Sequence, residues 1–259
     1  MDRTSLYFTG PREVDLEPTA VDPTPDEVVV ETRVSAVSAG TELLIYRDEV
    51  PADVPADETL DALEGDLTYP VRYGYAAVGE VAETGGRVDD DWLGRSVFGF
   101  NPHESRFAAR PESLLSVPEG VTDAEMAMYP SAETATSLVL DGRPRLGERV
   151  VVFGAGVIGL CTVGVLSAFP LKRLVAVDPV ESSRERAVEM GADRAVSPDE
   201  VEAAVGDTTV AGDADGADLV YELSGQPEAL DDAVDATGYD GRVVVGSWYG
   251  QKEATLELG

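Results

Sequence analysis

The sequence predicts an α/β protein whose second half forms a doubly wound parallel sheet and whose first half is rich in short strands. Three observations indicate this fold class. From Glu148 onward, apolar strand patterns alternate with helical patterns, as in a series of βαβ units. A glycine-rich turn at 154–159 joins the first of these strands to the first helix. Up to Gly120, by contrast, apolar stretches are short and end at glycine or proline.

The first part of the chain contains several short segments with strand character. Residues 26–37 include the run Val-Val-Val, and residues 75–82 and 95–100 are apolar stretches bounded by turn residues. We expect short strands in this part. The acidic segments 48–66 and 89–91 are expected to be an exposed loop and an exposed turn, because runs of like charge lie on solvated surfaces.

The second part begins with a helix expected over residues 122–140, where Thr122 and Glu125 have the spacing of a capping box. Because the strands that follow are separated by helices, the sheet is expected to be parallel. We expect two domains, 1–121 and 122–259. The expected elements are strands at 149–153, 173–177, 194–196, 218–222 and 242–246, helices at 157–168, 183–190 and 227–236, and a helix start at Ser197-Pro198-Asp199-Glu200.

The chain of 259 residues has 50 acidic and 19 basic side chains and a formal net charge of -31. Nucleic acid is excluded as an expected partner, because phosphate binding needs a basic surface. An anionic membrane surface would repel the chain for the same reason. Because 43% of the residues are apolar, the charge is typical of a solvated acidic shell rather than of disorder. We expect a cytoplasmic protein adapted to high salt, as in a halophile.

Two further features exclude other classes of protein. Cys161 is the only cysteine, so intrachain disulfides and four-cysteine zinc sites are excluded. Residues 150–169 carry no charge and have the length of a membrane span. Their four glycines and strand-like opening predict instead a buried strand that turns into a buried helix.

The glycine-rich turn has the GxGxxG spacing of a dinucleotide-binding loop, with Gly154, Gly156 and Gly159 at the glycine positions. In such a loop the first glycine permits a tight turn, the second lets the backbone approach a pyrophosphate, and the third allows close packing of helix against strand. The helix that begins at Val157 and Ile158 offers unpaired N–H groups and a positive dipole end to the phosphates. The turn therefore predicts a dinucleotide site.

The second strand of the series ends in Asp178, nineteen residues after Gly159. Its carboxylate can accept hydrogen bonds from both ribose hydroxyls and would repel a 2′-phosphate, so we predict NAD as the cofactor in preference to NADP. Arg184 is the residue that would serve an NADP phosphate, but we expect it on the exposed face of the next helix. Two alternatives stay open: a glycine turn without a ligand, and a methyltransferase that binds S-adenosylmethionine through a related loop.

Five stretches of the chain, one of which contains this turn, have a recognisable pattern: VSAVSAGTELLIY, YPVRYGYAAVGEVAETG, LGERVVVFGAGVIGL, LVAVDPVESSRERAVEMGAD and ADLVYELSGQPEALDDAVDATGYDGRVVVGS. Through them the whole chain resembles the medium-chain dehydrogenase/reductase family, of the zinc alcohol dehydrogenase type. The resemblance implies a GroES-like β-rich catalytic domain followed by a Rossmann domain. It also implies an NAD(P)-dependent oxidoreductase that transfers a hydride between the nicotinamide and a small alcohol or carbonyl substrate.

The sequence departs from this family at the zinc ligands. Ser38 stands where the family has a zinc-binding Cys, with one residue inserted, and Tyr75 and Ala76 replace the His and Glu of the second ligand segment. Because catalytic zinc needs three good protein ligands, we predict that the protein holds no zinc. His103, the only histidine, and Glu133 are the remaining candidates for a metal site. For His103 we favour a surface or capping role in its proline-containing loop.

Without zinc, a side chain must supply the proton to the carbonyl oxygen. By resemblance, Thr41 corresponds to the hydroxyl residue of the family's proton relay, and Tyr75 lies where a zinc ligand would face the cleft. Each also has a structural interpretation, Thr41 as a helix cap and Tyr75 as a filler of the space left by the metal. Thr134, Ser224 and Gly246 resemble the family's contacts to the nicotinamide.

Members of the family continue beyond the fifth strand of such a sheet, whereas this sequence stops at Gly259. We therefore expect a chain that is truncated at its C-terminus, with a homodimer only where the missing edge strand is present. The leading hypothesis is a zinc-independent, NAD-preferring oxidoreductase of small alcohols or carbonyl compounds. The alternative, suggested by the lost metal ligands and the missing segment, is a non-catalytic dinucleotide-binding protein.

Overall fold

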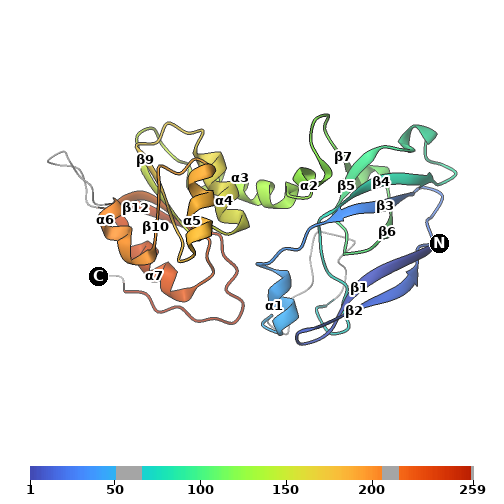
Figure 1. Ribbon diagram of the computed structural model, residues 1–259, viewed down its shortest axis with the longest axis horizontal. Helices are drawn as coiled ribbons and strands as arrows, with labels where there is room; N and C mark the ends of the chain where they lie inside the picture. The colour runs from blue at the N-terminus through green and yellow to red at the C-terminus, as the bar shows by residue number, and fades with distance from the viewer. Residues whose placement is uncertain (51–65, 206–215, 258–259) are drawn as a thin grey trace. The chain divides into compact units, whose positions relative to one another are not determined.

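The computed structural model describes residues 1–50, 66–205 and 216–257 of the chain. The chain divides into two compact units, an N-terminal unit of residues 1–130 and a C-terminal unit of residues 131–259 (Figure 1). Each unit has its own sheet and its own hydrophobic core. The division falls inside the segment 122–140, which the sequence predicts as one helix.

Strands dominate the N-terminal unit. The helices are short, and the last one to begin in this unit, α3 (Tyr129–Gly142), continues into the C-terminal unit. The other elements are β1 (Asp2–Gly10), β2 (Glu13–Ala20), β3 (Val28–Ser35), α1 (Glu42–Arg47), β4 (Ala77–Thr84), β5 (Ser96–Gly99), β6 (Arg106–Ala109), β7 (Leu114–Ser116) and α2 (Asp123–Met126), with 3-10 turns at Asp90–Trp92 and Pro111–Ser113.

The main sheet of the N-terminal unit is antiparallel and has the strand order β6-β3-β4-β5-β7. Its core includes Val28 and Val30 of β3, which are fully buried, so the valine run predicted as a strand is a central one. Ser35 at the end of β3 pairs with Ala77 at the start of β4, and Ala77 pairs with Gly99 at the end of β5. The segments before β4 and after β3 and β5 therefore leave the sheet at the same end.

The hairpin of β1 and β2 was not predicted from the sequence. All residues of β2 but one are exposed, and the strand includes Pro18, so it lacks the alternation of apolar and polar residues that marks a half-buried strand. The hairpin is connected to the rest of the unit through β1, with bridges from Ser5 to Glu104 and from Phe8 to Val71. The first of these bridges holds the loop between β5 and β6, and the second holds the segment before β4.

Strands and helices alternate in the C-terminal unit, as predicted. The strands at 149–153, 173–177 and 194–196 have the predicted bounds, whereas the last strand begins five residues earlier than predicted, at Thr237. The elements are β8 (Arg149–Phe153), α4 (Val157–Leu166), β9 (Arg173–Val177), α5 (Glu181–Glu189), β10 (Arg194–Val196), a 3-10 turn (Pro198–Glu200), α6 (Val201–Val205), β11 (Ala217–Glu222), α7 (Pro227–Asp235) and β12 (Thr237–Val245).

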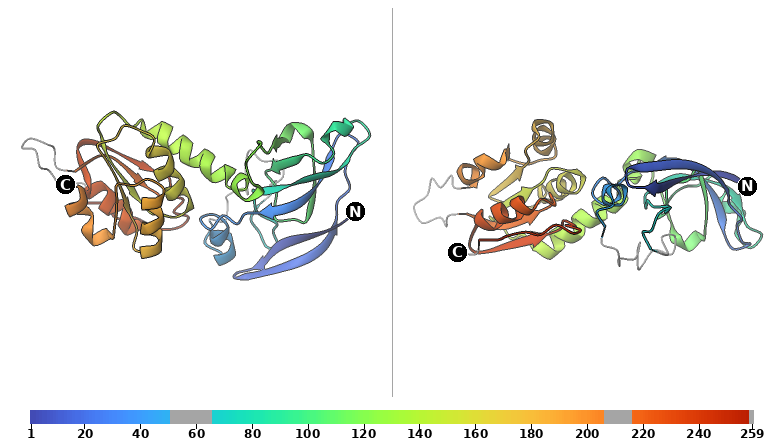
Figure 2. Two further views of the ribbon diagram at one scale, coloured as in Figure 1. Left: turned by 45° about the horizontal axis from the view of Figure 1, so that its top comes forward. Right: turned by 90° about the horizontal axis from the view of Figure 1, so that it is seen from below.

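The sheet of the C-terminal unit is parallel throughout and has the order β10-β9-β8-β11-β12. Helices cover both of its faces (Figure 2). Val150 and Val152 of β8 pack on the side of α4 and α5, and Val151 packs on the side of α6 and α7. The predicted doubly wound sheet is therefore confirmed. Its strand order reverses beside β8, and the carboxyl ends of β8 and β11 flank this point, where such sheets bind ligands.

One prediction about helices needs correction. The segment 122–140 forms two helices, α2 and α3, because Pro130 lacks the N–H needed to continue a helix and instead starts a new one. The capping box of Thr122 and Glu125 is present at the start of α2. The uncharged segment 150–169 is the predicted strand and helix, β8 and α4. None of the helices among the described residues has the length and apolar character needed to cross a membrane.

Candidate functional site

The turn between β8 and α4 is closely packed where two of its glycines lie and open at the third. Gly154 has a φ of +89°, and a Cβ on it would lie 2.8 Å from the backbone of Leu223 and Ser224, which follow β11. A Cβ on Gly159 would lie 1.8 Å from the carbonyl oxygen of Gly154. A Cβ on Gly156 would meet nothing within 4 Å. The open glycine therefore leaves room for a ligand beside the backbone.

The N-terminus of α4 lies at this opening. Gly156 is its N-cap residue and makes no side-chain cap, and Gly156 and Val157 are exposed while Ile158 is half-buried. The first N–H groups of a helix have no partner within the helix, and with the helix dipole they favour an anion. The residues of the predicted pyrophosphate site thus have the arrangement that such a site needs.

Asp178, directly after β9, closes one side of the turn. One oxygen of its carboxylate accepts a hydrogen bond from the backbone N–H of Ala155 at 2.8 Å, and the other accepts one from Val180 at 2.8 Å. Each oxygen keeps a further lone pair for a ligand. The expectation for Arg184 was wrong: its guanidinium is half-buried and donates to the carbonyl oxygens of Asp178 and Pro179 at 2.7 and 2.9 Å.

On the other side of the turn, Glu222 ends β11 and is fully buried. Its Oε1 accepts hydrogen bonds from the N–H and the hydroxyl of Ser224, at 2.7 and 2.5 Å, and from the N–H of Gly225 at 3.2 Å. Its Oε2 accepts one from the Tyr249 hydroxyl at 2.5 Å. Burial and the neighbouring Glu222 carboxylate raise the pKa of Tyr249, which therefore stays a donor.

Of the residues predicted to contact the nicotinamide, Gly246 lies beside Ser224, whereas among the described residues no contact connects Thr134 with them. The N–H of Gly246 donates to the Glu222 carbonyl oxygen at 3.0 Å, and the Ser247 hydroxyl accepts from the N–H of Gly225 at 2.9 Å. Ser224 and Gly246 therefore meet at the carboxyl ends of β11 and β12. Thr134 is half-buried in α3, and no contact places it with this group.

The N-terminal unit contains a second cluster of polar side chains, at the end of its sheet. His103, in the loop after β5, has its Nε2 2.8 Å from Oε2 of Glu42 and its Nδ1 2.5 Å from Oγ of Ser35. The other oxygen of Glu42 accepts from the N–H of Ser38 at 2.8 Å. The imidazole is buried, with 9% of its side chain exposed, so the prediction of a surface or capping histidine was wrong.

Gly74 makes room for this imidazole. It has a φ of +127°, and a Cβ on it would lie 2.8 Å from Cδ2 and Nε2 of His103. The backbone of His103 is held as well, since its carbonyl oxygen accepts from the N–H of Leu6 at 2.9 Å. The position of the ring is therefore fixed by the segment that contains Gly74 and by β1.

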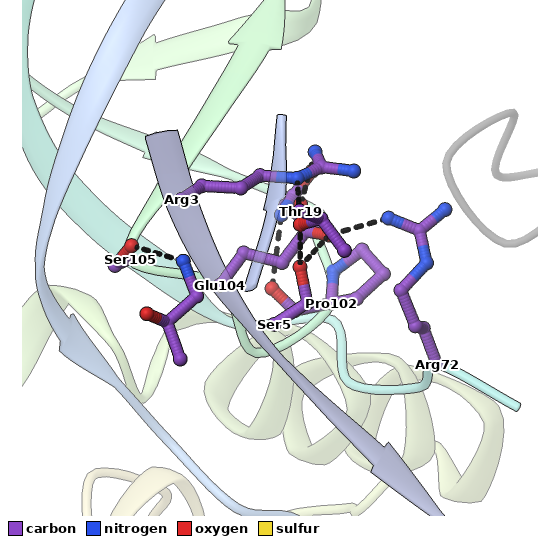
Figure 3. A network of polar contacts seen from close by, with 9 residues as sticks. Arg3, Ser5, Thr19, Arg72, Pro102, Glu104 and Ser105 are labelled. Carbon is purple, nitrogen blue, oxygen red and sulfur yellow. Dashed lines mark hydrogen bonds and ion pairs between the residues drawn. The ribbon is translucent and has the colours of Figure 1, made fainter. Parts of the chain in front are cut away.

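The residue after His103 fixes the loop from the opposite side. The Glu104 carboxylate, 2% exposed, accepts hydrogen bonds from Arg3 and Ser5, each at 3.0 Å, and also from Arg72 (Figure 3). Asn101 adds a fourth hydrogen bond at 3.2 Å. A buried carboxylate with this many donors is well compensated, so the network holds the segment from which His103 extends.

The two residues predicted to act as proton donors, Thr41 and Tyr75, are next in the chain to Glu42 and Gly74 of this cluster. Thr41 occupies the N-cap position of α1, yet its side chain makes no cap hydrogen bond. The ring of Tyr75 is half-buried, packs with the cluster of Phe8, Ile45 and Tyr73, and meets Tyr73 edge to face. Among the described residues, no hydrogen bond of either side-chain hydroxyl is found.

The described residues do not fit a catalytic zinc ion. Cys161 lies in α4 of the C-terminal unit, where burial raises the pKa of its thiol. Both ring nitrogens of His103 are already engaged by Ser35 and Glu42. Within 1–50, 66–205 and 216–257, no three His, Cys, Asp or Glu side chains are grouped to hold a metal ion. Glu133, the other candidate ligand, is exposed in α3 and accepts from the hydroxyl of Ser137.

Comparison with known proteins agrees with this architecture. Residues 157–259 match the family model described as zinc-binding dehydrogenase. D-guloside 3-dehydrogenase of Escherichia coli is 28% identical over 253 residues, which span 92% of this chain and 71% of that protein. The chain is similar to zinc-binding dehydrogenases. (R,R)-butanediol dehydrogenase of Bacillus subtilis is 25% identical over 226 residues, covering 76% of this chain and 62% of that protein.

Solved structures related to zinc-binding dehydrogenases share the fold. A Sinorhizobium meliloti protein bound to NADP has a TM-score of 0.80 and 19% identity, covering 100% of this chain and 80% of its own. Butanediol dehydrogenase from Bacillus subtilis has a TM-score of 0.79 and 22% identity, covering 98% and 80%. An alcohol dehydrogenase from Escherichia coli in complex with NADH has a TM-score of 0.76 and 18% identity, covering 99% and 79%. The predicted fold class, a GroES-like unit followed by a Rossmann unit, is confirmed.

Sequence reasoning missed two parts of the polar arrangement. Glu222 had a detectable signal, since it is an acid at the end of an apolar strand that was itself predicted. Ser35 and Glu42 had none, because they lie 68 and 61 positions from His103 in the chain and only the folded sheet brings them together.

Proposed function

We propose that this protein is an NAD-preferring oxidoreductase that transfers a hydride between the dinucleotide and the alcohol or carbonyl carbon of a small molecule. The observation that supports this most directly is the turn after β8. It combines an open glycine, Gly156, a helix N-terminus and the carboxylate of Asp178 at the point where the strand order reverses. These are the groups that a dinucleotide needs at this position of a doubly wound sheet.

The residues present fit such a cofactor. The N–H groups at Val157, Ile158 and Gly159 would hold the pyrophosphate, with Gly154 and Gly156 giving the backbone its shape. When bound, a nicotinamide dinucleotide supplies the group that accepts or donates the hydride. The protein's task is to orient the reactants and to move the proton.

At the other end of the site we propose that Ser224, Gly246 and Thr134 contact the nicotinamide. Ser224 is held by Glu222, since its hydroxyl and its N–H both donate to the same carboxylate oxygen. A residue held in this way has few alternative rotamers, so it would offer a bound ring a fixed polar surface.

The preference for NAD over NADP is proposed from charge. Asp178 would repel a 2′-phosphate, and the nearby Arg184 is already directed to two carbonyl oxygens. The pKa values of Asp199 and Glu200 are lowered chiefly by hydrogen bonds with Ser197 and to a smaller extent by the charge of Arg184, so this guanidinium lies near two acids. The guanidinium of Arg184 is therefore already engaged and is not available to bind the 2′-phosphate of NADP.

The reaction is proposed to proceed without zinc, because the described side chains do not provide three ligands for it. Proton exchange with the substrate oxygen is then a task for a hydroxyl of the N-terminal unit, for which Thr41 and Tyr75 are the candidates from resemblance. The similar proteins named above act, by their names, on a guloside and a butanediol, which are both alcohols. We propose a small polyol or related alcohol as the substrate class.

A non-catalytic dinucleotide-binding protein is the second candidate, favoured by the lack of a metal-ligand set. The two candidates agree on the cofactor and differ only in turnover. Oxidation of sorbitol, (R,R)-2,3-butanediol, L-threonine or a D-guloside with NAD⁺ would decide between them.

The cofactor proposal is tested by fluorescence titration of the purified chain with NADH and NADPH. The titration is done in concentrated KCl, because the net charge of -31 makes screening important for a compact state. We expect saturable binding with NADH preferred. Asp178→Ala should weaken NADH binding by at least about tenfold and reduce the discrimination against NADPH.

The control for Asp178→Ala is Glu181→Ala, which removes the same charge from the exposed first turn of α5. This variant should bind NADH as the wild type does. Equal affinities of the Asp178 variant and the wild type would contradict the role of Asp178. Binding of S-adenosylmethionine in place of NADH would show that the turn serves a methyltransferase.

A further inference from the structure

Ser35, His103 and Glu42 form one continuous chain of side-chain hydrogen bonds, of 2.5 and 2.8 Å, in the N-terminal unit. We propose that this triad is the acid–base group of the reaction, with Ser35 as the residue that contacts the alcohol or carbonyl oxygen. The inference rests on the proposed oxidoreductase function and deepens it. It differs from the assignment of Thr41 and Tyr75, because Ser35 alone of these three hydroxyl residues has a hydrogen-bonded proton acceptor.

The direction of the hydrogen bonds follows from the chemistry of the groups. An ionised carboxylate only accepts, so Nε2 of His103 carries the proton that it donates to Glu42. In the neutral ring, Nδ1 is then the acceptor, and the Ser35 hydroxyl donates to it. The Ser38 N–H on the other carboxylate oxygen keeps Glu42 in place. The serine oxygen is left with lone pairs for a substrate hydroxyl.

The surroundings argue against a merely structural role for the ring. The loop is already held by the Glu104 network and by the Leu6 N–H, so it does not need the imidazole for anchorage. The charged groups around His103 are Glu42, which faces the ring, and Glu104 with Arg3 and Arg72, which lie on the far side of the loop. Among the described residues, Glu42 is the charged side chain that contacts the ring.

Burial distinguishes the members of the triad. The side chains of Glu42 and His103 are only 3% and 9% exposed. Ser35 is half-buried and ends β3 beyond Glu31, the last residue of β3 that pairs with β6. Ser35 is therefore the member that a substrate can reach, and the other two are positioning residues that act through it.

With an alcohol as substrate, the proposed step moves two protons and one hydride. The O–H bond of the substrate breaks and its proton binds Oγ of Ser35, while the original proton of Ser35 moves to Nδ1 of His103. The hydride on the carbinol carbon would pass to the oxidised nicotinamide dinucleotide of the proposed function, which is the oxidant. The products are a carbonyl compound, the reduced dinucleotide and an imidazolium beside the Glu42 carboxylate. Carbonyl reduction is the reverse, with the imidazolium as the source of the proton.

The test compares Ser35→Ala and His103→Gln with a matched control, Ser105→Ala. Ser105 lies two residues after His103, and among the described residues its hydroxyl makes one hydrogen bond, accepted from the backbone N–H of Thr4 at 2.8 Å. Turnover of sorbitol, L-threonine, (R,R)-2,3-butanediol and a D-guloside is measured with NAD⁺ as a function of pH, and NADH affinity is titrated for each variant. Ser35→Ala removes one oxygen atom from a half-buried position, so it tests the proposal even where His103→Gln fails to fold.

We expect both triad variants to bind NADH like the wild type and to lose at least about 100-fold in kcat/KM, because general base catalysis is removed. The profile of the wild type should fall on its acid side, where the only histidine becomes protonated, and His103→Gln should lack this fall. Ser105→Ala should retain both activity and profile. A side chain that only supports the fold would leave the shape of the profile unchanged.

Three results would overturn the proposed role of the triad, and they differ in what they imply for the proposed function. Turnover of Ser35→Ala within twofold of wild type would overturn the triad and leave the proposed function intact. A wild-type chain that binds NADH but oxidises none of the four alcohols would also overturn it, in favour of the non-catalytic alternative. A wild-type chain that binds no dinucleotide would refute the proposed function itself and, with it, the triad's role in hydride transfer.

Discussion

The glycine turn of the C-terminal unit and the Ser35–His103–Glu42 triad of the N-terminal unit are built in opposite ways. The turn is encoded by six consecutive residues, 154–159, and its partner Asp178 directly follows the next strand. The triad draws its three members from the end of β3, the start of α1 and the loop after β5. One site is a property of a local segment, and the other is a property of the folded sheet.

This difference has a physical origin. A phosphate-binding turn works through backbone N–H groups, so it needs glycines at fixed spacing and leaves a recognisable pattern. An acid–base triad works through side chains that meet in space, so its members are free to lie anywhere in the chain. The first kind of site is therefore predictable from sequence, while the second is found only when the tertiary contacts are known.

The largest expected effect separates packing from binding within the glycine turn. Gly159→Ala places a Cβ 1.8 Å from the Gly154 carbonyl oxygen and should lower the free energy of unfolding by on the order of 4 kcal/mol. Gly156→Ala meets nothing within 4 Å and should change it by less than about 1 kcal/mol. NADH affinity should nevertheless fall at least about tenfold in Gly156→Ala. Urea denaturation and NADH titration measure the two quantities.

A larger loss of unfolding free energy in Gly156→Ala than in Gly159→Ala, with NADH affinity unchanged in Gly156→Ala, would contradict this prediction. The turn would then be a packing feature and not a binding site. Equal NADH affinity in Gly156→Ala and wild type would have the same meaning.

A second effect concerns how the triad is held. Glu104→Gln leaves Arg3 and Arg72 without their carboxylate and should lower the free energy of unfolding by about 3 kcal/mol. Because His103 is the adjacent residue, its ring ¹⁵N signals should shift as well. The control is Glu31→Gln, whose exposed ion pair with Arg106 should be worth less than about 1 kcal/mol. Unchanged ring signals would show that the Glu104 network and the triad are independent.

The smallest expected effect lies in the sheet that carries the turn. Arg242 of β12 donates two hydrogen bonds of 2.9 Å to the carboxylate of Glu148, next to β8. Burial acts to raise the pKa of Glu148, but the hydrogen bonds from Arg242 and from the N–H of Arg145 lower it below its usual 4.5. Arg242→Met should lower the free energy of unfolding by about 2 kcal/mol at neutral pH.

The pH dependence of this effect follows from the lowered pKa of Glu148. Its carboxylate stabilises the fold fully at pH values above 4.5, and this stabilisation is lost as the pH falls through the lowered pKa. The difference between wild type and Arg242→Met should therefore be constant near neutral pH and shrink in acid. The exposed pair of Arg87 and Asp26 provides the control, because Arg87→Met should show no such change. A difference that stays constant into acid would contradict the assignment.

The sequence by itself determined the C-terminal unit in detail. The alternation of strands and helices gave the parallel sheet, and the bounds of β8, β9 and β10 agree with the prediction because apolar runs between turn residues are unambiguous. It was less informative for the N-terminal unit, where the exposed strand β2 and the three- or four-residue strands β6 and β7 leave no clear pattern. The loop at 48–66 lies mostly outside the described residues.

Tertiary structure decided the positions of side chains that act together. It buried His103 and gave it Ser35 and Glu42 as partners, and it directed Arg184 to the end of β9 instead of leaving it on an exposed helix face. It also made Glu222 the buried centre of the strand ends at β11 and β12. Local sequence fixes what the backbone can do, whereas hydrogen bonds between distant side chains depend on strand order and register, which only the folded sheet sets.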